Sequence, residues 1–248
     1  MAHINSSEKN GIIIEVCCGS AEDVLAAATA GTHRVELNSA LELGGLTPSI
    51  GALRIAVQNS DIKIISMLRP RGGGFCYSDK EFETMLLELD LLLENGSHGI
   101  AFGILTKDGE LDDERCKIIL DKMDKYGGKK EAVFHMAFDR STTEEFEMLS
   151  RLDSLGFVRL LTTGRASSAE LGADKLRRYI EFLENKRSGL EILPGGSIRL
   201  NNAPEIVKKT GAKELHGKCH KDMGDGAQTV DIAALKAYVE WSKSALSI

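Results

Sequence analysis

The sequence lacks an excess of positive charge and any long apolar run, and each absence excludes a class of protein. It contains 31 Lys and Arg residues against 37 Asp and Glu residues, which gives a formal net charge of −6. Domains that bind the nucleic-acid backbone are usually basic, so this balance argues against a nucleic-acid partner. No stretch approaches the roughly 18 continuous apolar residues of a membrane-spanning helix, which argues against a membrane protein.

The sequence also lacks an export signal at its start. Residues 1–11 are mostly polar and do not contain the apolar core of a signal peptide. We expect these residues to form a disordered extension on a cytoplasmic protein, and residues 12–248 to form one domain.

Cysteine is present but does not form the pattern of a disulfide-stabilised protein. The five cysteines are odd in number, and the chain of 248 residues is long for a disulfide scaffold. We therefore expect reduced thiols, which leaves buried packing, metal binding or chemical reactivity as their uses.

Short apolar segments alternate with helical segments along the whole chain. The expected strands cover residues 12–16, 33–37, 62–68, 99–103, 131–135, 157–161, 190–193 and 213–216, and a helix is expected after each. Such alternation indicates parallel βαβ units, and eight units in about 250 residues predict an α/β fold with a single (β/α)₈ TIM-type barrel. A doubly wound open sheet is the alternative, but no Gly-x-Gly-x-x-Gly turn follows the first strand.

Three sequence signals predict where helices begin. Ser20 stands three residues before Asp23, and Ser78 with Glu81 forms a capping box. Thr47 followed by Pro48 predicts a third helix start, with the proline at the first helical position.

Charged residues occur near the carboxyl ends of strands that should be apolar throughout. The catalytic candidates among them are Glu15, Glu36, His135 and His216. Side-chain alternation predicts that they face the barrel interior at its C-terminal rim, where TIM barrels carry out their chemistry. The alternative is that buried charges pair with one another and hold the barrel closed, which we favour for Arg34 and Glu36.

An anion-binding site is predicted at the same rim. Arg69 and Arg71 flank a proline and precede three glycines, and a guanidinium group matches carboxylate or phosphate geometry. The loops that follow the sixth and seventh strands contribute Thr163, Gly164, Gly195 and Gly196. In TIM barrels, the loops after the seventh and eighth strands commonly bind phosphate through backbone N–H groups and a helix N-terminus. The alternative is that these glycines only permit tight turns.

Two adjacent cysteines, Cys17 and Cys18, end the first strand. Thiolates are preferred ligands of Cu(I), so both residues are candidate metal ligands, and Cys18 is the weaker one. Adjacent residues on a regular strand point to opposite faces, so both could bind one ion only if the backbone turned there. A buried structural thiol is the alternative for each.

Ordered sequence segments identify a resemblance to the CutC copper-homeostasis family, from about residue 13 to residue 217. The matching segments are Glu15-Val16-Cys17, Arg34-Val35-Glu36-Leu37, Gly44-Gly45-Leu46-Thr47-Pro48-Ser49, Met67-Leu68-Arg69-Pro70-Arg71-Gly72-Gly73, Phe134-His135, Ala137-Phe138-Asp139, Leu161-Thr162-Thr163-Gly164, Leu193-Pro194-Gly195-Gly196 and Glu214-Leu215-His216. The chain departs from the family at Met136, where the family usually has arginine. Asn38 stands where the family has cysteine or asparagine.

The resemblance implies a TIM-type barrel, a cytoplasmic location, homo-oligomers (dimer or tetramer) and Cu(I) binding through cysteines. Cys17 is the best ligand candidate by this resemblance. The chain is thus expected to act in copper homeostasis. The alternative is a TIM-barrel enzyme that acts on a small anionic or phosphorylated substrate at the rim. A third hypothesis, supported only by Met136, is a scaffold that has lost catalysis.

Overall fold

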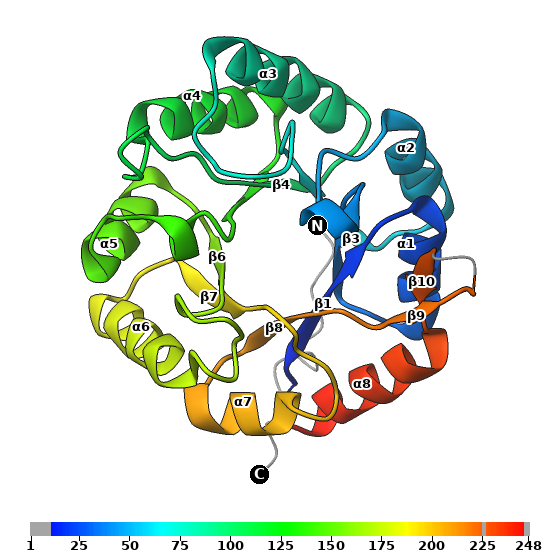
Figure 1. Ribbon diagram of the computed structural model, residues 1–248. Helices are drawn as coiled ribbons and strands as arrows, with labels where there is room; N and C mark the ends of the chain where they lie inside the picture. Colours follow the sequence, from blue (N-terminus) through cyan, green and yellow to red (C-terminus); the bar gives the residue numbers. More distant parts are fainter. Residues whose placement is uncertain (1–10, 225–226, 246–248) are drawn as a thin grey trace.

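In the part of the chain that the structure describes, eight parallel strands form the inner wall of a barrel, and eight helices surround them (Figure 1). The computed structural model describes residues 11–224 and 227–245. The strands are β1 Ile13–Cys18, β2 Arg34–Leu37, β3 Lys63–Met67, β4 Gly99–Phe102, β5 Glu131–Phe134, β6 Arg159–Thr162, β7 Glu191–Pro194 and β8 Glu214–Gly217. The helices are α1 Ala21–Ala30, α2 Ile50–Asn59, α3 Asp79–Glu94, α4 Asp113–Met123, α5 Glu145–Leu155, α6 Ala173–Lys186, α7 Ala203–Thr210 and α8 Ile232–Ser244.

The order of the strands confirms the predicted TIM-type barrel. Neighbouring strands pair in the order β7-β6-β5-β4-β3-β2-β1-β8. The two end strands approach each other where Ile198, just after β7, forms a parallel bridge with Gly217 of β8. The doubly wound open sheet, the alternative considered from the sequence, is therefore wrong.

Two of the three predicted helix starts agree with the structure. Ser20 accepts a hydrogen bond from the N–H of Asp23, and the Ser78–Glu81 capping box is present, so both predictions are confirmed. The predicted start at Thr47 is wrong, because α2 begins at Ile50 with Ser49 as its cap. The Thr47 hydroxyl instead accepts from the N–H of Arg69, which ties the β2 loop to the end of β3.

A two-stranded hairpin between β8 and α8 was not predicted. It consists of β9, His220–Asp222, and β10, Gln228–Val230, paired antiparallel. The buried carboxylate of Asp23 on α1 holds it by accepting from the Thr229 hydroxyl at 3.0 Å and the Val230 N–H at 2.8 Å. This anchor joins segments about two hundred residues apart, so no local sequence signal indicates it.

Two apolar layers hold the barrel. The larger one fills the space between the strands and the helices. The smaller one lies inside the barrel and consists of Ile65, Met67, Ala101, Val133, Leu161 and Leu193. The rest of the interior is polar, and this polar part contains the candidate site. Of the predicted extension at residues 1–11, all but Gly11 lies outside the described residues. Among the described helices, none has the length and apolar character that a membrane crossing requires.

Candidate functional site

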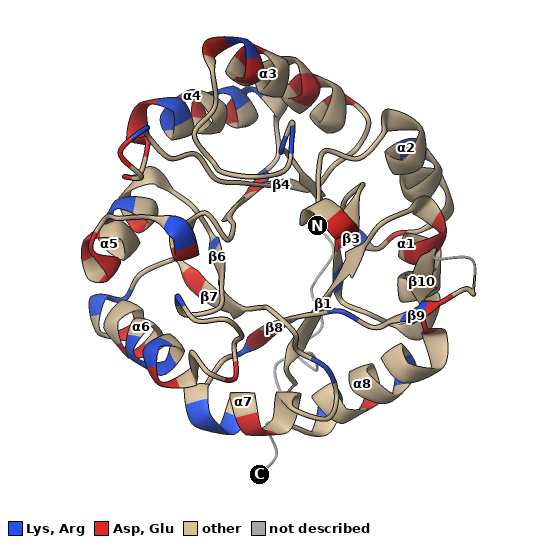
Figure 2. Ribbon diagram, in the orientation of Figure 1, with Lys and Arg blue, Asp and Glu red and all other residues tan. Residues whose placement is uncertain are grey.

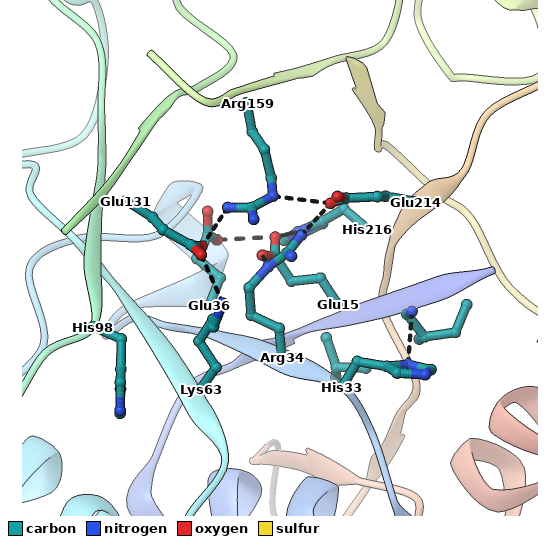
Figure 3. Close-up of polar contacts among 12 residues, drawn as sticks. Glu15, His33, Arg34, Glu36, Lys63, His98, Glu131, Arg159, Glu214 and His216 are labelled. Atoms are coloured by element: carbon teal, nitrogen blue, oxygen red, sulfur yellow. Dashed lines mark hydrogen bonds and ion pairs between the residues drawn. The ribbon is translucent and has the colours of Figure 1, made fainter. Parts of the chain in front are cut away.

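Arg34 of β2 is the centre of a buried group of charges inside the barrel (Figure 3). Its Nε donates to Glu15 of β1, and its Nη2 lies 2.6 Å from a carboxylate oxygen of Glu214 on β8. The side chains of all three residues are less than one tenth exposed. A buried arginine between two carboxylates is compensated, so the structural interpretation of Arg34 is confirmed.

The same charges continue to the opposite wall of the barrel. Arg159 of β6 contacts Glu214 at 2.9 Å and Glu131 of β5 at 2.6 Å, and Lys63 of β3 contacts Glu131 at 2.6 Å (Figure 3). We call the six residues Glu15, Arg34, Lys63, Glu131, Arg159 and Glu214 the ionic network. It crosses the interior and joins strands that are not neighbours in the sheet.

Glu15 connects this network to the C-terminal end of the barrel. One of its oxygens contacts Arg34, and the other lies 2.8 Å from Nδ1 of His216 on β8. Burial by itself would raise the pKa of Glu15, but the attraction of Arg34 and the hydrogen bond with His216 hold it well below its usual range. Glu15, a predicted catalytic candidate, thus has both oxygens engaged and holds the His216 ring in place.

Three potential metal ligands converge just above Glu15. The Sγ of Cys17, a carboxylate oxygen of Glu36 and a ring nitrogen of His216 all lie within 4.8 Å of one another. We call these residues the metal cluster. Cys17 and Glu36 are register partners on β1 and β2, and Glu15 and His216 are partners on β1 and β8. Barrel closure therefore brings together residues that are up to about two hundred positions apart in the chain.

Protonation in the metal cluster follows from burial and from mutual contacts. Burial raises the pKa of the Cys17 thiol, although its hydrogen bond with His216 opposes this. Burial likewise raises the pKa of Glu36, against the attraction of His216. For His216, burial acts to lower the pKa, but Glu36, Cys17 and Glu15 raise it well above its ordinary value. A metal ion that binds here must therefore displace protons from the cluster.

The residues of the metal cluster fit a soft or borderline metal ion. Thiolate suits Cu(I) and Zn²⁺, imidazole suits copper and zinc, and a carboxylate can complete a Zn²⁺ set. The His216–Glu15 contact also has the usual form of a metal-bound histidine, whose second ring nitrogen meets a carboxylate. Over residues 11–224 and 227–245, no other group of three or more His, Cys, Asp or Glu residues is close enough to hold an ion.

Asn38 is a neighbour of two members of the metal cluster. Its Nδ2 donates to Glu36 at 2.9 Å and lies 3.6 Å from the sulfur of Cys17. Asn38 stands at the position where the family has cysteine or asparagine. Its two contacts orient the side chains of Glu36 and Cys17.

Cys18 lies on the other face of β1 and does not join the cluster. It is fully buried in the outer apolar layer, and its thiol donates to the carbonyl of Val16. The backbone stays extended at this point, so adjacent side chains point apart. This placement corrects the prediction of Cys18 as a weaker ligand.

A cavity of about 1380 Å³ opens above the metal cluster, and we call it the barrel mouth. Cys17, Glu36 and His216 line it on one side. His135 of the β5 loop lines it on the other side, against the ring of Phe75. Burial, with the nearby charge of Arg69, lowers the pKa of His135 to about 3, so this imidazole is neutral. Three of the four predicted catalytic candidates, Glu36, His135 and His216, therefore share one cavity.

The two arginines of the predicted anion clamp are engaged with the protein. Arg71 contacts Glu81 through two nitrogens, at 2.5 and 3.2 Å, and donates to backbone carbonyls of its own loop. Arg69 donates to the carbonyls of Leu43, Gly44, Gly45 and Gly73. Both side chains line the mouth, and both fix the shape of the β3 loop.

The predicted phosphate loops are also well occupied by internal contacts. The N–H of Thr163 donates to Asp139, that of Gly164 to Thr162, and that of Gly195 to the Thr162 carbonyl. A Cβ at Gly195 would lie 2.4 Å from Leu161, and one at Gly196 would lie 2.6 Å from Thr163. Packing therefore explains these glycines, and anion binding by these loops stays a prediction.

The chain is similar to known proteins over most of its length. Residues 12–221 match the profile of the CutC family. A "family protein CutC" of Treponema denticola is 42% identical over 83% of this chain and 80% of its own length. A human protein named "Copper homeostasis protein cutC homolog" is 38% identical over 84% of this chain and 73% of its own length. The crystal structure of a putative copper homeostasis protein CutC from Streptococcus agalactiae is 31% identical, with a TM-score of 0.76, and the match covers 83% of this chain and 98% of that one.

Proposed function

The chain belongs to the CutC family, and from this membership we propose that it acts in copper homeostasis by binding Cu(I) as cargo in the metal cluster. The observation that carries the proposal is the convergence of Cys17, Glu36 and His216 within 4.8 Å at the base of an open cavity. The cavity gives an ion, or a donor that carries it, a path to the cluster.

Each residue of the cluster has a distinct part in this proposal. The Cys17 thiolate supplies the soft ligand that Cu(I) prefers, and the His216 imidazole supplies a second one. Glu36 compensates the positive charge. Glu15 and Arg34 act beneath the site, because they fix the orientation of the His216 ring without contacting the ion.

The same proposal includes the wider setting of the protein. We place it in the cytoplasm as a homo-oligomer, dimer or tetramer, with residues 12–248 as one domain after a short disordered extension. The resemblance to the family supports the location and the assembly. The net charge of −6 supports the absence of a nucleic-acid partner.

The proposal is tested by Cys17→Ser in a Cu(I) titration against a chromophoric competitor under reducing, anaerobic conditions. We expect at least about a tenfold loss of affinity, because the variant replaces the only thiolate of the cluster with a poor ligand. Cys76→Ser is the matched control, since Cys76 is an exposed thiol on the wall of the same cavity. If Cys17→Ser binds copper as tightly as Cys76→Ser, the metal cluster is not the copper site.

A second candidate function is favoured by the size of the mouth. A cavity of about 1380 Å³ exceeds what one ion needs and is large enough for a small metabolite. His135 and His216 on its walls have pKa values shifted in opposite directions, as in acid–base pairs of enzymes. We propose a TIM-barrel enzyme acting on a small anionic substrate as this alternative. Its test is NMR detection of product from organic acids and sugar phosphates, with His135→Asn as the inactive variant. Turnover by His135→Asn at the wild-type rate would contradict this second function. The absence of turnover of every compound by the wild type would also contradict it.

A further inference from the structure

Arg69 is a buried arginine without a carboxylate partner among the described residues. It is only 6% exposed, and its hydrogen-bond partners are four backbone carbonyls and the Tyr77 hydroxyl, which carry no net charge. Its guanidinium also lies 4.9 Å from the centre of the Phe75 ring. The buried arginines of the ionic network differ, because Arg34 and Arg159 each contact two glutamates. Buried charges in proteins are normally compensated, so we expect an anion in the mouth to balance the positive charge of Arg69.

Further cations line the same cavity. Lys107, Arg140 and Lys218 belong to the loops after β4, β5 and β8, and in the described part of the chain their side chains form no ion pair. The acidic residues of the mouth do not neutralise them. Asp139 accepts hydrogen bonds from the Thr162 hydroxyl and from the backbone N–H groups of Thr163 and Arg165. The carboxylate of Glu36 faces His216.

This excess of positive charge contrasts with the rest of the molecule. The whole chain carries a net charge of −6. Figure 2 shows basic and acidic positions together on outer helices such as α4 and α6, and mainly acidic positions on α3. A cavity lined by one sign of charge concentrates ligands of the opposite sign, even in a protein whose net charge would repel them.

We propose that the barrel mouth binds a small metabolite bearing an oxyanion, either a phosphate or a carboxylate. Its charged group contacts Lys107, Arg140 and Lys218 within the field of Arg69. The body of the ligand lies over the apolar side chains of Met67 and Leu161, which also line the cavity. This inference deepens the second candidate function by naming the ligand class, and it holds whether or not copper binds beside it.

The test is isothermal titration calorimetry of the metal-free protein with two probes, inorganic phosphate and malonate. Arg140→Gln and Lys218→Gln each remove one proposed contact, and we expect each to weaken binding by about tenfold, as charge-assisted hydrogen bonds are lost. Arg54→Gln is the control, because Arg54 is an exposed cation on α2 outside the cavity. We expect its affinity to stay within about twofold of the wild type.

The outcomes separate this inference from the others. Phosphate binding without malonate binding identifies a phosphorylated ligand, and the reverse identifies a carboxylate. The inference is overturned if the wild type binds neither phosphate nor malonate. It is also overturned if Arg140→Gln, Lys218→Gln and Arg54→Gln bind the probe with equal affinity. Because the protein is metal-free, a failed copper titration leaves the result unaffected. Because only binding is measured, the absence of turnover also leaves it unaffected.

Discussion

The interior of the barrel has two levels, which differ in whether their buried charges are paired within the protein. In the ionic network, every arginine contacts two carboxylates, and the charges satisfy one another across the barrel. One level higher, at the mouth, Arg69 has no carboxylate partner in the described structure, and a thiol, a carboxylate and an imidazole converge on one point. Pairing within the protein makes the first set structural, whereas incomplete pairing leaves the second set available to ligands.

Glu15 and Glu36 show the same contrast between two residues of one type. Both are buried, and they lie on adjacent strands near His216. Arg34 holds the pKa of Glu15 far down against the effect of burial, whereas burial raises the pKa of Glu36, which has no arginine in contact. Burial of a carboxylate therefore does not by itself indicate function. A fixed counter-charge distinguishes a buried carboxylate that stabilises the barrel from one that is available to a ligand.

The largest expected effect comes from removing the counter-charge of the network. Arg34→Met leaves Glu15 and Glu214 buried without their shared partner, and we expect the free energy of unfolding to fall by about 3–5 kcal/mol. Arg69→Met removes an arginine that pairs with no carboxylate, and we expect a smaller loss of about 1–2 kcal/mol from unsatisfied carbonyls. Urea unfolding of both variants measures the difference. Equal losses would contradict the division into two levels.

A smaller effect is expected from changing the availability of ligands at the mouth. Asn38→Cys places a second thiol beside Cys17, because the Asn38 amide already lies 3.6 Å from the Cys17 sulfur. We expect Cu(I) affinity to rise by about tenfold or more, measured by competitor titration in a reductant. Asn38→Ser is the control, since a hydroxyl of similar size is a poor ligand for Cu(I). A gain that is equal in both variants would show that the thiol does not reach the ion.

The smallest effect concerns the acid sensitivity of the network. Hydrogen bonds from Arg159 and Lys63 lower the pKa of Glu131, although burial opposes this. Because the folded pKa lies below the unfolded value of about 4.3, the stability from this group is present above that value and is lost as the pH falls through the folded pKa. In urea unfolding between pH 6 and pH 3, we expect Glu131→Gln to show a shallower decline, by about 1 kcal/mol.

Glu83→Gln provides the reference for this pH series. Glu83 forms an exposed ion pair with Lys80 on α3, and such surface pairs contribute little to stability. Its decline with pH should follow that of the wild type. A Glu131→Gln curve parallel to the wild-type curve would show that the Glu131 contacts do not stabilise the folded state.

The sequence by itself determined the barrel, the family and the inward face of the strands. Eight alternating segments predicted the fold, and the spacing of Glu15 and Cys17 placed them on one face, because side chains alternate along a strand. The capping signals at Ser20 and Ser78 were sufficient because their partners lie three residues away.

Only the tertiary structure decided which of these residues form a site. Closure of the barrel brings β8 beside β1, so His216 meets Glu15 and the metal cluster across about two hundred residues of chain. Contacts in the folded chain also decided that Arg71 binds Glu81, which is 10 residues away, and that Arg69 pairs with no carboxylate in the described residues. Alternation along a strand is local and can be predicted, whereas the compensation of a charge depends on every strand that surrounds it.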